Sequence, residues 1–146
     1  NVLLDEESGR AICMLDLDTV MPGSSLYDFG ESVRAGAATV TEYDKTGDVE
    51  LNLNFFRASL EGYLSHMSHH LTGEEKDLLA YSVWLMTMER GINFLTDYLE
   101  GDRNIIDFSE EKQNLYAAVN QFYLVLDIED KMNRMEEVTK EVLMSL

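Results

Sequence analysis

Apolar residues recur at intervals of three and four through most of this sequence, and only two short segments near its start have the pattern of strands. The interval is that of an amphipathic helix, and it recurs in several segments between about residue 26 and about residue 143. The strand-like segments cover residues 2–4 and 11–15, joined by a Gly-containing connection of hairpin length. Because two strands alone cannot bury a core, packing between helices must supply it. The sequence therefore predicts a mainly α fold, with a β-hairpin followed by an assembly of four to five helices.

Four helical segments are expected after the hairpin, with a turn at residues 44–48 between the first two. They cover residues 26–34, 53–71, 72–99 and 109–143, the last as one helix or as a broken pair. Ser24 is a candidate N-cap for the first helix, and Thr72 with Glu75 matches a capping box at the start of the third. Residues 78–95 are apolar on nearly all sides, so their helix is predicted to form the buried centre.

The composition excludes several classes of protein. The 146 residues include 28 acidic and 11 basic side chains, for a net charge of −17, so the chain lacks the basic stripe that neutralises nucleic-acid phosphates. It contains no apolar run of the roughly 18 residues that a membrane span requires. Cys13 is the single cysteine, which excludes an intrachain disulfide and suits a cytoplasmic protein. We expect Cys13 to be a small buried hydrophobic residue.

Acidic residues at the end of the second strand suggest a metal site. Asp16 and Asp18 follow the apolar run 11–15, and alternation along a strand would place both on one side, where water is scarce. The hairpin would bring Asn1 next to Asp16, and carboxylate and amide oxygens are ligands that Mg²⁺ uses when substrate phosphates complete its coordination. Asn1, Asp16 and Asp18 are therefore the candidate metal ligands. Asp18 could instead hydrogen-bond to a metal ligand without touching the metal, or accept hydrogen bonds from loop amides.

Several stretches of this sequence resemble a known family. They read Asn-Val-Leu-Leu-Asp at residues 1–5, Leu-Asp-Leu-Asp-Thr-Val-Met-Pro-Gly at 15–23, Tyr-Asp-Phe-Gly at 27–30 and Phe-Leu-Thr-Asp-Tyr-Leu-Glu-Gly-Asp at 94–102. The sequence resembles the aminoglycoside phosphotransferase and choline kinase superfamily, and within it the N-acetylhexosamine 1-kinases. This resemblance implies the C-terminal part of a protein-kinase-like C-lobe, with a metal-binding hairpin and loop at residues 1–30 and a helical subdomain at residues 31–146.

The resemblance also implies an activity. The family's enzymes transfer the γ-phosphate of ATP, with Mg²⁺, to a hydroxyl group, and the expected acceptor here is the anomeric hydroxyl of an N-acetylhexosamine. By the same resemblance Asn1 and Asp16 hold Mg²⁺, and Asp28 supports the site. The catalytic Asp and the nucleotide-binding N-lobe are expected before residue 1, so we expect the 146-residue chain alone to be inactive. A noncatalytic helical interaction domain, whose acidic hairpin is only a solvated cap, is the alternative.

Charged residues in the most apolar helix are candidates for contact with the substrate. A charge buried there must be paired or must face a cavity, so Glu89 or Arg90 could reach a substrate cleft, and an internal ion pair is the other interpretation. Asp97, Tyr98 and Asp102 resemble family positions near the acceptor-sugar pocket. Arg90, Asp97 and Tyr98 are therefore the predicted substrate-binding residues.

Three histidines, His66, His69 and His70, stand near the end of the second expected helix. The first and third are four residues apart and could share a face, a spacing that zinc sites use. No glutamate lies in the zinc-protease position between them, and a solvated helix end is the simpler interpretation.

Overall fold

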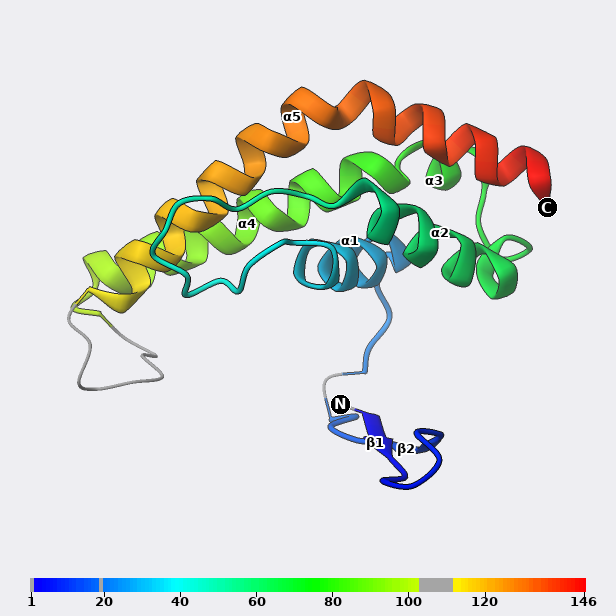
Figure 1. Cartoon of the computed structure of the whole chain (residues 1–146), viewed down its shortest axis with the longest axis horizontal. Helices are drawn as coiled ribbons and strands as arrows, with labels where there is room; N and C mark the ends of the chain where they lie inside the picture. Colours follow the sequence, from blue (N-terminus) through cyan, green and yellow to red (C-terminus); the bar gives the residue numbers. More distant parts are fainter. Residues whose placement is uncertain (1, 19, 103–111) are drawn as a thin grey trace.

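The structure is a computed structural model that describes residues 2–18, 20–102 and 112–146. Within these residues the fold is mainly α: an N-terminal antiparallel hairpin is followed by five helices (Figure 1). The strands are β1 (Val2–Leu4) and β2 (Ala11–Met14), and the helices are α1 (Ser25–Gly36), α2 (Leu53–Met67), α3 (Gly73–Asp77), α4 (Leu79–Leu99) and α5 (Gln113–Ser145). The predicted hairpin and helical assembly are both confirmed.

The hairpin pairs Val2 with Met14 and Leu3 with Cys13, and its register shifts between Leu3 and Leu4. Its connection closes through the backbone of Asp5, which donates to the Arg10 carbonyl over 2.9 Å. These bonds make a local ladder, but two strands have no second layer of their own to bury either face.

Apolar hairpin residues are consequently exposed, and the prediction of a buried second strand is wrong. Ile12 is 62% exposed and Met14 is 68% exposed. Cys13 is also exposed, so the expectation of a buried hydrophobic thiol is wrong as well. Figure 1 shows the reason: the hairpin (blue) stands apart from the helices and is joined to α1 by the chain that leads into it.

Local capping signals set where several helices begin. The Ser24 side chain accepts from the backbone N–H of Leu26 at the start of α1, as expected for an N-cap. The predicted capping box of Thr72 and Glu75 is present in full at the start of α3. The predicted turn at residues 44–48 is present between α1 and α2.

The single helix predicted over residues 72–99 is instead two helices. α3 ends at Asp77, Leu78 has φ −92° and ψ −1°, and α4 begins at Leu79. The break leaves the Leu78 side chain exposed while Leu79 becomes fully buried. The apolar spacing continues across Leu78 and no proline interrupts it, so the sequence pattern does not indicate this break.

Helix packing supplies the core, with α4 against both α1 and α5. Gly30 allows α1 to approach closely, because a Cβ at this position would lie 2.4 Å from the Ser82 carbonyl oxygen of α4. Both long helices have exposed apolar residues, so the prediction that α4 is enclosed on all sides holds only in part. Its exposed apolar residues are Tyr81, Leu85, Ile92 and Leu99.

The last helix is a single element of 33 residues, and not a broken pair. Its expected first residues, from 109, fall partly outside the described part of the chain. Among the described residues, the helices do not combine the length and the apolarity that crossing a membrane would need.

Candidate functional site

The predicted metal-binding segment follows directly after β2, and its two carboxylates are exposed. β2 ends at Met14, and Asp16 has φ 59°, in the left-handed region that aspartate tolerates better than most residues. Alternation along a strand therefore stops before Asp16, and the argument that placed Asp16 and Asp18 on one dry side of β2 is wrong. Both carboxylates are open to water, and Asn1 lies outside the described residues.

The described part of the chain contains no group of three or more His, Cys, Asp or Glu side chains placed to hold a metal ion. Asp16 and Asp18 therefore do not belong to an all-protein metal cage there. Mg²⁺ commonly takes one or two carboxylates from the protein and the rest of its oxygens from water and substrate phosphates. The exposed pair fits that sparse kind of site.

A hollow of about 480 Å³ lies where the loop after the hairpin enters α1. The residues that line it are Val20, Met21, Pro22, Gly23, Ser24, Ser25, Tyr27 and Asp28. Asp28 is exposed in the first turn of α1, where the helix dipole favours an acidic side chain. Asp28 therefore lines the same hollow as the loop residues that follow Asp16 and Asp18 in the sequence.

A second hollow, of about 350 Å³, shares one residue with the first. It is lined by Tyr27 from α1 and by Leu85, Met86 and Glu89 from α4. The Glu89 carboxylate accepts from the Asn93 side-chain amide over 2.7 Å and is exposed. The lining therefore combines apolar surface with one carboxylate, and the shared Tyr27 makes the two hollows neighbours.

Arg90 follows Glu89 directly in the sequence, but its side chain has a different partner. Its guanidinium pairs with Glu42 over 3.3 Å and stands 4.4 Å from the centroid of the Phe94 ring. Glu42 also pairs with Arg34, whose side chain is only 3% exposed. This is the internal ion pair that the sequence left open for the adjacent charges, and Arg90 is not among the residues lining either hollow described above.

The shared carboxylate of this network has an altered pKa. Burial raises the pKa of the Glu42 carboxyl, but hydrogen bonds from Arg90 and Arg34 and the charges of both guanidinium groups outweigh burial. The resulting pKa lies below the ordinary value. The sequence gives no signal for this role of Glu42, because Glu42 stands 48 residues from Arg90 in a loop without a motif.

The other predicted substrate residues lie near the end of α4. Asp97 and Tyr98 are half-buried there, and neither lines the hollows beside Tyr27. Asp102 has φ 58° and accepts from the backbone N–H of Asn114 over 3.4 Å. Asp102 therefore links the end of α4 to the start of α5, and its geometry is that of a structural contact.

The three histidines are exposed at the end of α2, which stops at Met67. The Nδ1 atom of His66 lies 2.7 Å from the hydroxyl of Ser65. None of the three belongs to a cluster of metal-ligand type within the described residues.

Sequence reasoning missed Tyr27, Leu85 and Met86. Tyr27 lies within a stretch that carries the family resemblance, but a tyrosine in an amphipathic helix has no signature that separates a lining residue from a packing residue. Leu85 and Met86 likewise read as ordinary helix residues, and only the approach of α1 to α4 brings them next to Tyr27. No protein-family model matches the sequence.

Proposed function

We propose that this chain is part of an ATP-dependent small-molecule kinase, in which the loop after the hairpin holds Mg²⁺ and the neighbouring hollows receive the acceptor. The observation that carries the proposal is the exposed Asp16, turned out of the strand in a left-handed conformation, with Asp18 two residues on and the hollow at the start of α1 next along the chain. Oxygen donors on an open edge suit a metal ion whose remaining ligands are phosphate oxygens.

Asp16 and Asp18 are the residues that would hold Mg²⁺ in this proposal. When bound, Mg²⁺ would neutralise charge that develops on the transferred phosphate. Asp28 would brace the loop from the first turn of α1, where it is exposed beside the same hollow. Asn1 stays a predicted ligand.

The second hollow supports a sugar as the acceptor. Tyr27, Leu85 and Met86 offer apolar surface to the C–H face of a pyranose, and the Glu89 carboxylate can accept a hydrogen bond from one of its hydroxyls. A lining with one carboxylate and no basic side chain favours a neutral acceptor over an anionic one. We therefore propose an N-acetylhexosamine, with its anomeric hydroxyl as the site of transfer.

The metal step is tested on the chain by titration with Mn²⁺, a paramagnetic substitute for Mg²⁺. Amide signals of residues 14–18 and 20–24 should broaden first in the NMR spectrum. The variant Asp16→Asn should lose most of that broadening, and Asp130→Asn, which removes an exposed charge from α5, should keep it. Equal broadening in the two variants would contradict the proposed metal site.

The transfer step is tested by following labelled phosphate from ATP to a panel of hexosamines, with the full-length gene product as the enzyme. We expect an N-acetylhexosamine 1-phosphate as product. Asp16→Asn should lower kcat by at least about a hundredfold, since even the outer partners of a metal ligand typically contribute about 10- to 100-fold. If a different hydroxyl is phosphorylated, the kinase proposal stands, but the assignment of the anomeric hydroxyl as the acceptor is wrong.

A noncatalytic interaction domain is the second candidate, and the exposed apolar hairpin favours it. Ile12, Met14 and Leu17 are all more than half exposed, which is typical of a surface that a partner covers. This candidate predicts that Mn²⁺ does not distinguish Asp16→Asn from Asp130→Asn. The same titration therefore separates the two functions.

A further inference from the structure

The side chain of Met86 forms the inner wall of the second hollow, the one of about 350 Å³ that Tyr27, Leu85 and Glu89 also line. Met86 is half-buried, whereas the other three lining residues are exposed. The backbone of α1 lies directly behind Met86, because a Cβ added at Gly30 would stand 2.7 Å from the Met86 Cγ. The length of the Met86 side chain therefore determines how deep the hollow is.

The lining suits the polar and the apolar parts of an N-acylated sugar differently. Glu89 is the one charged side chain among the four, and its carboxylate accepts a hydrogen bond from the Asn93 amide. A carboxylate has about four lone-pair sites, so it can still accept from a sugar hydroxyl. The methyl of an acetyl group gains most from leaving water, and the apolar side chains of Leu85 and Met86 are where it can do so.

Met86 has little freedom to make room for a larger group. Methionine is flexible and fills irregular gaps, so a free Met side chain would adapt to acyl chains of different length. Here the space that a Cβ at Gly30 would occupy is already filled by Met86, and the backbone carbonyl of Ser82 lies beside the same point. Met86 consequently cannot retreat toward α1, and added methylenes on the acyl chain would meet a fixed wall.

We propose that Met86 selects the acyl group of the acceptor: an N-acetyl methyl packs against it, and longer acyl chains do not fit in front of it. The proposal rests on the proposed kinase function and deepens it, because it names the residue that chooses among N-acylated hexosamines. Met86 acts by packing against the acceptor and takes no part in the transfer of phosphate.

The first test compares kcat/KM of the full-length gene product for N-acetyl-, N-propionyl- and N-butyrylglucosamine. The unaltered enzyme should lose about tenfold for each added methylene, the lower end of what a hydrophobic pocket achieves. Met86→Ala should remove that penalty, so that the butyryl sugar becomes at least as good a substrate as the acetyl sugar. Met86→Phe should shift the preference the other way, toward N-formylglucosamine. A loss of stability alone cannot produce opposite shifts in preference.

Met88→Ala is the matched control for these variants. Met88 is also a half-buried residue of α4, and it is not among the residues that line the hollow. If Met86→Ala ranks the acyl sugars as Met88→Ala and the unaltered enzyme do, the role of Met86 is wrong, although the kinase function stands. If the full-length enzyme phosphorylates none of these sugars, the kinase function is wrong, and direct binding decides the role of Met86.

Direct binding is measured by NMR on the 146-residue chain, with methionine labelled at its methyl carbon. The Met86 signal, assigned through Met86→Leu, should shift on titration with N-acetylglucosamine. Glucose has no acyl group, so it should shift this signal much less at the same concentration.

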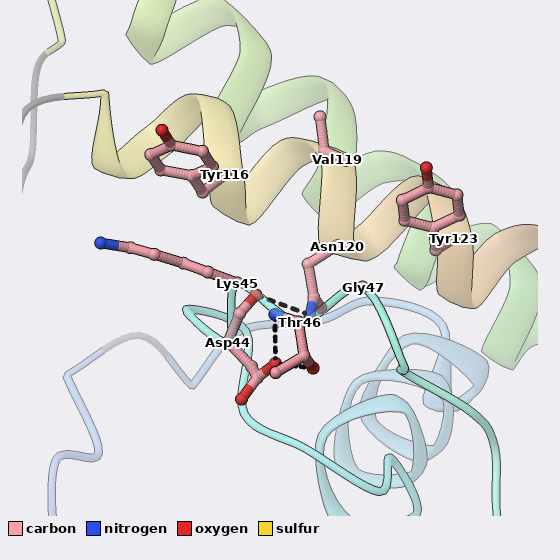
Figure 2. Close-up of a pocket in the computed structure, with 8 residues that line it drawn as sticks. All are labelled: Asp44, Lys45, Thr46, Gly47, Tyr116, Val119, Asn120 and Tyr123. Atoms are coloured by element: carbon pink, nitrogen blue, oxygen red, sulfur yellow. Dashed lines mark hydrogen bonds between the residues drawn. The ribbon is translucent and has the colours of Figure 1, made fainter.

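A third hollow, of about 470 Å³, is an internal control for this titration (Figure 2). It lies between the loop that joins α1 to α2 and the first half of α5, and it shares no residue with the second hollow. Tyr116 and Tyr123 line it and are 42% and 50% exposed, so it offers an aromatic surface to any sugar. Amide signals of residues 44–47 and 116–123 should stay in place while the Met86 signal moves. If they move first, or if glucose shifts Met86 as strongly as N-acetylglucosamine does, the proposal is wrong.

Discussion

Removal of one charge at Glu42 should destabilise the fold, because this carboxylate joins the loop after α1 to both α1 and α4. It pairs with Arg34 of α1 and with Arg90 of α4, and Arg34 also contacts Gln121 of α5 over 3.4 Å. The side chain of Arg34 is 3% exposed and that of Glu42 is 21% exposed, so water can replace little of what the carboxylate provides. The variant Glu42→Gln keeps the shape and removes the charge.

The expected loss in the free energy of unfolding is about 2 kcal/mol. Charge-assisted hydrogen bonds are worth about 1.5–3 kcal/mol, and complete removal of one partner of a buried pair costs about 3–5 kcal/mol. The value for Glu42→Gln lies at the lower end, because Arg34 keeps its pair with Glu31 and the new amide can still accept one hydrogen bond. A loss of about 2 kcal/mol corresponds to a fall in Tm of about 5–8 °C for a chain of this size.

The difference in the free energy of unfolding between the original chain and Glu42→Gln should also depend on pH. Because the pKa of Glu42 is lowered in the folded state, its contribution is fully present above the ordinary value of 4.5 and is lost as the pH falls through the folded-state pKa. Arg34 and Arg90 stay charged throughout this range. The stability difference should therefore be largest near pH 7 and should shrink below pH 4.5.

Urea denaturation followed by circular dichroism measures both effects, at pH 7 and at stepwise lower pH while the transition can still be observed. Glu61→Gln is the matched control, since it removes an exposed carboxylate from α2. If Glu42→Gln is no less stable than Glu61→Gln at pH 7, or if the difference stays constant into acid, the network does not carry the stability argued for it.

Three further predictions test the packing, the caps and the hairpin. Gly30→Ala should cost about 2–3 kcal/mol, because its Cβ would meet the rigid Ser82 carbonyl, whereas Gly62→Ala on α2, which meets no atom within 4 Å, should be neutral or stabilising in the same urea assay. Thr72→Ala should cost about 1 kcal/mol by removing the capping box, and a change below about 0.3 kcal/mol would contradict that role. Cys13 should react with a thiol reagent at the rate of an exposed cysteine in the folded chain, and a rate limited by unfolding would show that the hairpin is covered in solution.

Much of the local structure could be predicted because its causes lie within a few residues. Ser24 and Thr72 bond to backbone N–H groups two and three residues away, so their capping roles follow from the sequence alone. The hairpin follows in the same way from two apolar segments and a short connection. The break at Leu78 could not be predicted, since the segment keeps the apolar spacing of one helix and contains no proline.

The candidate site also has parts that the sequence could predict and parts that it could not. Asp16, Asp18 and Asp28 could be proposed from their places in the sequence, but their exposure could not, because it depends on what covers the hairpin. The hollow that joins Tyr27 to Glu89 has no sequence signal, since its walls come from helices more than 50 residues apart.

The sequence by itself determined the helical content, the helix caps and the order of the acidic residues after the hairpin, all of which depend on interactions between near neighbours along the chain. Only the tertiary structure decided which charges are paired and which surfaces are open. Arg90 turns to Glu42 while Glu89 faces a hollow, although the two are adjacent. The physical reason is that the helix sends successive side chains about 100° apart, so the elements that pack around it determine the surroundings of each.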